Sequence, residues 1–210
     1  MQVEDFLKTV NSLRLPLGEF SNDLKSLHPQ QQYAGEYTIS ESDDPCDLLL
    51  IGTEINGSCQ NVGGTPSLNK CLVSYLMNGE IRPIVVKRDK TLAARALLRL
   101  LVDEKTNKPV LLLERIYSNV EDATIKQAIQ VWAQEKAEKM GIPLVSREVG
   151  SGKPYPGTVK FLGGFAPYTY SDASSEGTVN GPTTIKGCHI LHATAACNIK
   201  SLLQANVNKT

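Results

Sequence analysis

Three apolar segments joined by short polar turns, and followed by one long amphipathic segment, constrain the fold more than any other part of the chain. Residues 81–87 are rich in branched side chains, residues 91–102 alternate between two faces, and residues 109–117 have three leucines at their centre. Polar turns at 89–90 and 105–108 separate them. The pattern predicts an antiparallel three-stranded meander, although alanine, leucine and arginine would also suit a helix over 91–102.

The two faces of the predicted central strand differ in polarity. One face carries small and apolar side chains, while the other carries Arg95 and Arg99 between leucines. If the turn at 105–108 sets the register that we expect, Glu114 lies across from Arg99 on the same face. Arg95, Arg99 and Glu114 are therefore candidates for binding a carboxylate or phosphate. The alternative is a cross-strand ion pair on a solvated face.

A long amphipathic helix follows the meander. The segment Ser118-Asn-Val-Glu121 has the residues of a capping box at its start, and Gly141 ends it after Met140. Its predicted apolar face consists of Ile125, Ala128, Ile129, Trp132 and Met140. Residues 142–147 begin another short strand.

Before the meander, the apolar run at 48–51 lies between Pro45 and Gly52, and it predicts a buried strand. Residues 52–65 contain four glycines and predict a loop. The next segment, 66–78, predicts a helix that is capped by a threonine and closed by Asn78-Gly79.

The part after the helix is rich in glycine and proline. Residues 148–184 predict a loop-rich β region with strands near 159–162 and 168–170, and residues 183–192 predict a last strand. The fold class is therefore α+β, with a mostly antiparallel sheet and a loop-rich β C-terminal part. We expect a helix over 1–14 within an irregular arm (1–45), a single domain (46–197) and a polar tail (198–210).

The composition restricts the partners. Lys+Arg and Asp+Glu both number 22, so the chain lacks the basic excess of a nucleic-acid-binding domain, and we expect no nucleic acid partner. It has neither an apolar run long enough to span a membrane nor a signal peptide. Five cysteines, an odd number, favour reduced thiols. These features predict a cytoplasmic protein, or one exported without a classical signal peptide.

The first catalytic candidate is Cys59. The triplet Gly57-Ser-Cys59 resembles the nucleophile segment of the papain-like thiol peptidases. In that family a histidine follows far downstream of the cysteine. Here His189 and His192 come 130 (189−59) and 133 (192−59) positions after Cys59. The resemblance implies that Cys59 is a nucleophile, with His192 or His189 as its base. The alternative is an inert cysteine buried in a loop.

A possible zinc site is the second candidate. Cys188, His189, His192 and Cys197 lie within ten residues of each other and have side chains that zinc prefers. On a strand, however, neighbouring side chains point to opposite faces, so one site is hard to close. We therefore predict no metal and no cofactor.

The third candidate is the order of elements over residues 81–147, which is three strands, a helix and a strand. This order resembles the central part of the GNAT acyltransferases. In that family a glycine-containing turn before the helix holds the pyrophosphate of coenzyme A. Here the turn Tyr117-Ser-Asn-Val-Glu-Asp-Ala123 has no glycine and two carboxylates. The resemblance thus implies a GNAT-like fold that lacks the coenzyme A motif.

An aromatic segment, Phe165–Asp172, is the last candidate. Tyr168, Tyr170 and Asp172 could contact a ligand or an unidentified protein partner, or they could pack beneath the loop. The first functional hypothesis is thus a thiol-dependent hydrolase or acyl-transfer enzyme. The alternatives are an interaction module that uses this segment and a GNAT-like acyltransferase fold without the coenzyme A motif.

Overall fold

The meander predicted from the sequence forms the centre of the protein in a computed structural model. This structure describes residues 31–32, 37–69, 71–148, 152–161, 169–170, 178–179 and 183–192. β3 (Ile81–Arg88), β4 (Thr91–Asp103) and β5 (Pro109–Leu113) pair antiparallel in chain order. Asp89 and Asn107 have φ values of 54° and 53°, a left-handed conformation that Asp and Asn adopt more readily than most residues. The strand prediction for 91–102 is therefore confirmed.

Ten strands of the described residues join one sheet, with the main path β1-β2-β3-β4-β5-β7-β12. β1 (Gln31–Gln32) and β2 (Tyr37–Glu41) extend the sheet beyond β3. These residues belong to the arm that we expected to be irregular, and that expectation is wrong for them. The predicted helix at 1–14 and the tail at 198–210 lie outside the described residues.

The sheet is mixed, so the antiparallel expectation is confirmed only in part. Helix α6 (Ala123–Met140) crosses over after β5, and β7 (Leu144–Ser146) then pairs parallel to β5, with Leu111 opposite Leu144. Parallel neighbours require such a crossover connection. β12 (His189–His192) returns antiparallel beside β7.

The loop-rich C-terminal part contains short strands, as predicted, but the single strand predicted over 183–192 is two strands on either side of Gly187, whose φ is 72°. β8 (Val159–Lys160) pairs with β4 and with β11 (Thr184–Ile185). β6 (Tyr117–Ser118) also pairs with β4, beside Ala94 and Arg95. β9 (Thr169–Tyr170) and β10 (Thr178–Val179) form a separate two-stranded sheet.

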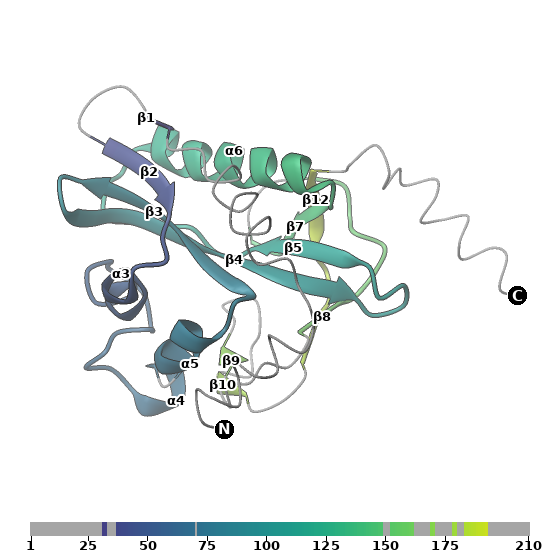
Figure 1. Ribbon diagram of the computed structural model, residues 1–210, viewed down its shortest axis with the longest axis horizontal. Coiled ribbons are helices and arrows are strands. Elements are labelled where there is room, and N and C mark those ends of the chain that lie inside the picture. Colours follow the sequence, from purple (N-terminus) through teal and green to yellow (C-terminus); the bar gives the residue numbers. More distant parts are fainter. Residues whose placement is uncertain are drawn as a thin grey trace, which may run out of the picture. The chain divides into compact units, whose positions relative to one another are not determined.

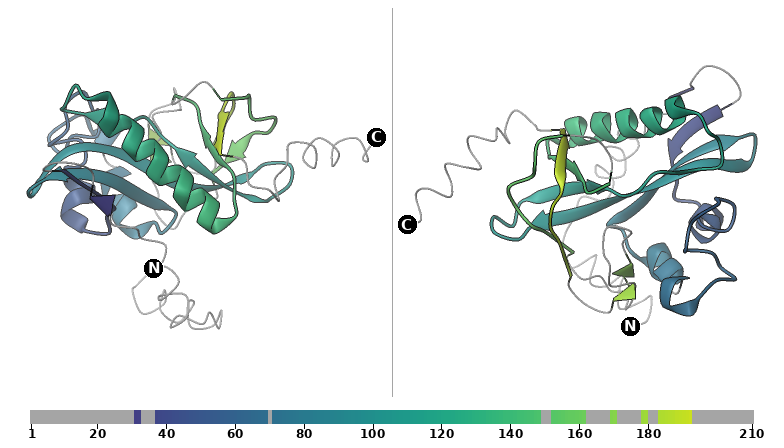
Figure 2. Two further views of the ribbon diagram at one scale, coloured as in Figure 1. Left: turned by 90° about the horizontal axis from the view of Figure 1, so that it is seen from above. Right: turned by 180° about the vertical axis from the view of Figure 1, so that it is seen from behind.

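Helix α6 covers one face of the large sheet (Figures 1 and 2). Trp132 and Ile129 are fully buried against the sheet residues of this side. The sheet contributes Ile39, Ile84, Val86, Ala94, Ala96, Leu98, Leu111, Leu113 and Leu144. At the end of the helix, Gly141 has the left-handed φ of 66° that a C-cap favours, as predicted.

The N-terminus of α6 differs from the predicted capping box. Asp122 is the N-cap, and its Oδ1 accepts a hydrogen bond from the backbone N–H of Thr124 at 2.8 Å. Ser118 instead belongs to β6, where its hydroxyl contacts the backbone of Val120. The prediction of Ser118 as the cap is wrong because pairing with β4 keeps this residue extended.

Three short helices cover the opposite face: α3 (Pro45–Leu50), α4 (Pro66–Asn69) and α5 (Cys71–Met77) (Figure 1). The last two confirm the predicted helix over 66–78. The strand predicted at 48–51 is wrong. Asp44 caps Cys46 N at 2.8 Å and Pro45 occupies the first turn, so the leucines that follow continue a helix. No helix among the described residues is both long and apolar enough to span a membrane.

Candidate functional site

Two arginine side chains are buried on the sheet face that α3, α4 and α5 cover. Arg95 and Arg99 lie on the same face of β4, as the alternation predicts, and their exposed fractions are 0% and 1%. The alternative of a solvated face is wrong, because the short helices and the loop at 52–61 cover this side of the strand. Burying a charged side chain is costly unless it is paired and hydrogen-bonded, so the contacts of each arginine define this site.

Arg99 makes an ion pair with Glu114. Arg99 Nε lies 2.8 Å from Glu114 Oε1, and Glu114 is 2% exposed. Glu114 follows β5 and lies opposite Leu97 of β4, whose carbonyl accepts the N–H of Glu114. The ion pair between Arg99 and Glu114 is therefore diagonal across the two strands. Burial lowers the pKa of Arg99, but the charge of Glu114 outweighs this and raises that pKa above its ordinary value. Arg99 therefore remains charged.

Arg95 is held by a loop and by an aromatic ring. Its Nη2 donates to Ser58 Oγ at 2.7 Å and to Gln60 Oε1 at 3.2 Å. Its guanidinium carbon lies 4.2 Å over the ring centroid of Tyr117, which is a cation–π contact. Ser58 and Tyr117 are half-buried, so these two contacts connect Arg95 with the surface.

Gln60 and Tyr75 connect the two arginines. The Gln60 side chain is fully buried, and its Nε2 donates to Tyr75 Oη at 2.9 Å. Arg99 Nη2 donates to the same hydroxyl at 2.9 Å. Burial raises the pKa of Tyr75 well above its usual range, so the phenol stays neutral and can accept both bonds. A continuous chain of hydrogen bonds therefore runs from Ser58 to Glu114.

The sequence predicted the charged members of this group but not the neutral ones. Arg95, Arg99 and Glu114 were candidates because their alternation places them on one face. Ser58 and Gln60 flank the candidate Cys59 in a loop, and Tyr75 has the spacing of a core residue in a helix. Their contacts with the arginines join residues that are 24 to 37 positions apart, and no local pattern predicts contacts of that kind.

The structure does not bring Cys59 and the histidines together. Cys59 packs against the cluster that includes Leu48 and Leu97. His189 and His192 lie on β12, which β5 and β7 separate from β4. At a spacing of about 4.8 Å per strand, β12 is roughly 14 Å from β4. Cys59 and the two candidate histidines therefore belong to different parts of the fold, and their pairing stays a prediction.

The zinc candidates also have separate surroundings. Cys188 is buried, and burial raises the pKa of its thiol to about 11, which disfavours the thiolate that zinc needs. In the part of the chain that the structure describes, no three His, Cys, Asp or Glu side chains are grouped so that they could hold a metal ion. Cys197 lies outside the described residues, as do Tyr168, Asp172 and the side chain of Tyr170.

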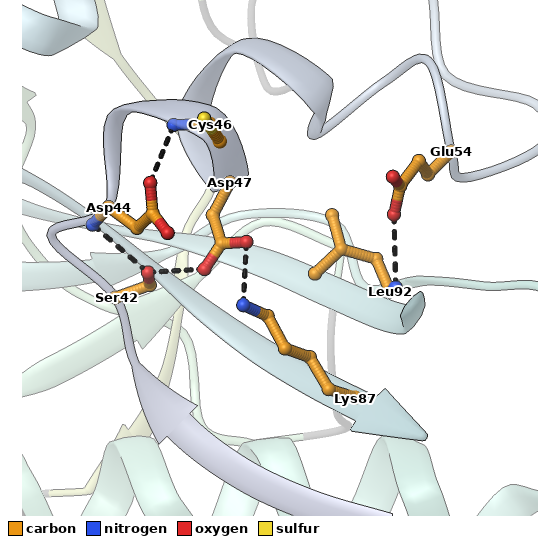
Figure 3. Close-up of polar contacts among 7 residues, drawn as sticks. All are labelled: Ser42, Asp44, Cys46, Asp47, Glu54, Lys87 and Leu92. Atoms are coloured by element: carbon orange, nitrogen blue, oxygen red, sulfur yellow. Dashed lines mark hydrogen bonds and ion pairs between the residues drawn. The ribbon is translucent and has the colours of Figure 1, made fainter. Parts of the chain in front are cut away.

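A second polar group joins β2, α3 and β3 (Figure 3). Ser42 Oγ donates to Asp47 Oδ2 at 2.5 Å, and Lys87 Nζ lies 2.7 Å from the other carboxylate oxygen. In the same figure, Glu54 Oε2 accepts the backbone N–H of Leu92 at 3.0 Å. Because Lys87 neutralises the Asp47 carboxylate and Ser42 donates to it, this group holds α3 against the sheet, and we assign no ligand to it.

The turn before α6 cannot hold a pyrophosphate in the way that the GNAT motif does. Asp122 places a carboxylate on the helix N-terminus, where its Oδ1 accepts from both the backbone N–H and the hydroxyl of Thr124. Glu121 adds a second negative charge beside it. The N–H of Thr124 is therefore already used by the chain itself, and the two carboxylates oppose a phosphate at this helix N-terminus.

Comparison with known proteins assigns no family. No protein-family model matches the chain, and no curated protein matches its sequence. Among solved structures, a similar chain is a “putative acetyltransferase” from Salmonella typhimurium, determined with its cofactor acetyl-CoA. The match has 12% sequence identity and a TM-score of 0.44, and it covers 78% of this chain and 99% of the other. A likeness at this level assigns no function to this chain.

Proposed function

We propose that this protein binds a small anionic ligand at Arg95, on a GNAT-like α+β scaffold that does not use the coenzyme A turn. The observation that carries the proposal is the way in which Arg95 is held. Its buried Nη2 donates to the hydroxyl of Ser58 and the amide oxygen of Gln60, both from a loop. An anionic oxygen is a stronger acceptor for a guanidinium than either of these neutral groups, so a ligand carboxylate or phosphate can replace one of them.

The burial of two arginines supports a functional role. Replacing a buried charged group by apolar side chains of similar volume is often neutral or stabilising. Leu97 and Leu101 alternate with the arginines on the same strand face and are fully buried. An apolar core could therefore have formed here at lower cost, and a binding role explains why charged residues stand in its place.

The scaffold supports a ligand-binding role without supporting acyl-coenzyme A as the ligand. The order of three antiparallel strands, a helix and a further strand resembles the GNAT acyltransferases, as the sequence predicted, although the parallel pairing of the last strand was not predicted. Asp122 and Glu121 nevertheless occupy the position at which that family binds the pyrophosphate. Because a fold alone does not determine an activity, the proposal relies on Arg95 and its neighbours.

Ligand-dependent stability tests this function. The melting temperature of the full chain is measured with acetate, butyrate, succinate, inorganic phosphate and coenzyme A. A ligand at a hundred times its dissociation constant adds about 2.7 kcal/mol to the free energy of unfolding. We expect a small anion to raise the melting temperature. Coenzyme A should raise it no more than inorganic phosphate does.

Arg95→Lys identifies the site, because lysine keeps the charge and loses the planar fork. We expect this variant to bind the anion at least about tenfold more weakly, and Arg88→Lys, at an exposed arginine on β3, to bind as the wild type does. Chemical shifts of the Ser58 and Gln60 amides in the wild-type protein provide a readout that needs no variant. The proposal fails if no small anion stabilises the wild type, or if these amides do not shift when one does.

A further inference from the structure

The loop that covers Arg95 is anchored firmly at both ends. On one side, Asn119 Nδ2 donates to the carbonyl of Glu54 and its Oδ1 accepts from Asn56 N, both at 2.7 Å. On the other side, Asn69 Nδ2 donates to the carbonyls of Asn61 and Val62, each at 2.9 Å. Between these anchors, residues 57–59 form the tip of the loop.

The tip of the loop carries Ser58, one of the two loop groups that contact Arg95. Gly57 has a φ of 78° and nothing within 4 Å of the position that a Cβ would occupy. Ser58 and Cys59 are half-buried, whereas Gln60 is fully buried. The Gln60 carbonyl and Ser58 Oγ both lie against Gly52, and the Gln60 side chain is in addition tied to Tyr75. Of the two loop groups that contact Arg95, Ser58 is therefore the easier to displace.

The ring of Tyr117 restricts the direction from which a ligand reaches Arg95. Because the ring lies 4.2 Å from the guanidinium carbon, it covers one face of the flat group. The ring leaves the edges of the guanidinium uncovered, and Ser58 Oγ lies on one of these edges, at Nη2. A carboxylate binds an arginine edge in its own plane, whereas a tetrahedral phosphate that binds there projects oxygens above and below that plane, one of them toward the ring.

Apolar side chains lie on the same side of the sheet as Arg95. Val85 is the cross-strand partner of Arg95 in β3. Val85 forms a small buried cluster with Ile55 and Leu92, and Tyr117 packs against it. A ligand group next to the carboxylate would therefore contact hydrocarbon rather than charge, and a short apolar group would gain from this contact.

We infer that the ligand is a small carboxylic acid with a short apolar body, and that its carboxylate takes the place of the Ser58 hydroxyl on Arg95. This inference rests on the proposed anion site and names its substrate class. In the ligand-free protein, Ser58 occupies the position of the ligand oxygen. On binding, the tip at 57–59 moves away while Gln60 keeps its bonds to Arg95 and Tyr75. No covalent step is involved.

The test uses two substitutions of Ser58 and titration with butyrate. Ser58→Ala removes the group that competes with the ligand, so butyrate is expected to bind as tightly as to the wild type or up to about tenfold more tightly. Ser58→Asp provides an internal carboxylate at the same place, so butyrate is expected to bind at least about tenfold more weakly. Asn56→Asp adds the same charge at an exposed position of the same loop and is expected to keep the wild-type affinity.

The outcomes distinguish this inference from the proposed function. If no anion binds to the wild type or to Ser58→Ala, the anion site itself is wrong. If butyrate binds but Ser58→Ala weakens it, Ser58 is part of the bound site and the displacement is wrong. If inorganic phosphate binds more tightly than butyrate, the carboxylate class is wrong while the anion site stands. Circular dichroism of each variant establishes that it is folded before the titration is interpreted.

Discussion

The Gln60 side chain donates a hydrogen bond to the Tyr75 hydroxyl at 2.9 Å, and this contact joins the loop over β4 to helix α5. Both side chains are almost completely buried. The amide must present its oxygen to Arg95, which can only donate, and its nitrogen to Tyr75. The orientation of Gln60 is therefore determined by its two neighbours, and a change at Tyr75 affects the group that holds Arg95.

Tyr75→Phe tests this connection. The substitution removes the oxygen that accepts from Gln60 and from Arg99, and it leaves two buried donors without that acceptor. We expect the free energy of unfolding to fall by about 2–4 kcal/mol, measured by urea denaturation. Tyr37→Phe, at a half-buried tyrosine of β2, is the matched control and should change it by less than about 0.5 kcal/mol. If Tyr75→Phe lowers the free energy of unfolding no more than the control does, the Tyr75 hydroxyl does not stabilise the fold in the way that we propose.

Glu114→Gln tests the charge pair. Arg99 and Glu114 are both buried, so loss of the carboxylate leaves a buried guanidinium without its counter-charge. We expect a loss of about 3–5 kcal/mol in the free energy of unfolding. Glu148→Gln breaks another arginine–glutamate pair, with Arg115, whose side chain is 53% exposed. That loss should be at most about 1 kcal/mol, and a similar loss in both variants would contradict the importance of burial.

The parts of the fold that local rules determine were predicted well. The three strands of the meander follow from alternation and from turns at Asp89 and Asn107, where the side chain tolerates a left-handed backbone. The end of α6 at Gly141 follows from the same kind of local conformational rule. These features depend on residues that are close together in the sequence, so one chain is enough to predict them.

The errors arose where distant residues decide the structure. Ser118 begins a segment with the sequence of a capping box, but Ser118 pairs with Ala94 of β4 and is therefore part of strand β6. The polar face of β4 is buried because α5 and a loop cover it, and alternation does not reveal what covers a face. The contact between Gln60 and Tyr75 has the same origin. The site was therefore predicted through its charges but not through the neutral groups that orient them.

The stability of the protein should fall in alkaline solution. Burial raises the pKa of the Cys71 thiol from 9.0 to about 11. Between these pH values the unfolded chain loses a proton that the folded protein keeps, so the free energy of unfolding decreases as the pH rises. Urea denaturation from pH 8 to 11 should show this decrease, and Cys71→Ser should make it less steep. Cys46→Ser, at an exposed cysteine, should leave its steepness unchanged.

Thiol reactivity tests the hypothesis of a thiol-dependent enzyme. Cys46 is exposed, Cys59 is half-buried, and Cys71 and Cys188 are buried with raised pKa values. We expect iodoacetamide at neutral pH to label Cys46 first and the two buried thiols last. Because Cys59 and the candidate bases His189 and His192 lie in different parts of the fold, Cys59 should react no faster than Cys46. A much faster reaction at Cys59, measured by mass spectrometry of peptides, would restore the nucleophile hypothesis.

Gly52→Ala tests whether the loop must pack closely to hold Arg95. A Cβ at residue 52 would lie 2.4 Å from the carbonyl oxygen of Gln60 and 2.8 Å from Ser58 Oγ, so the loop must shift. Overpacking of this kind typically costs about 1–3 kcal/mol. Because the shift moves both groups that contact Arg95, butyrate affinity should change together with stability. Gly79→Ala, where a Cβ would meet nothing within 4 Å, should alter neither by more than a small amount. If Gly52→Ala leaves the free energy of unfolding and the butyrate affinity at their wild-type values, the loop does not position Arg95 in the way that we propose.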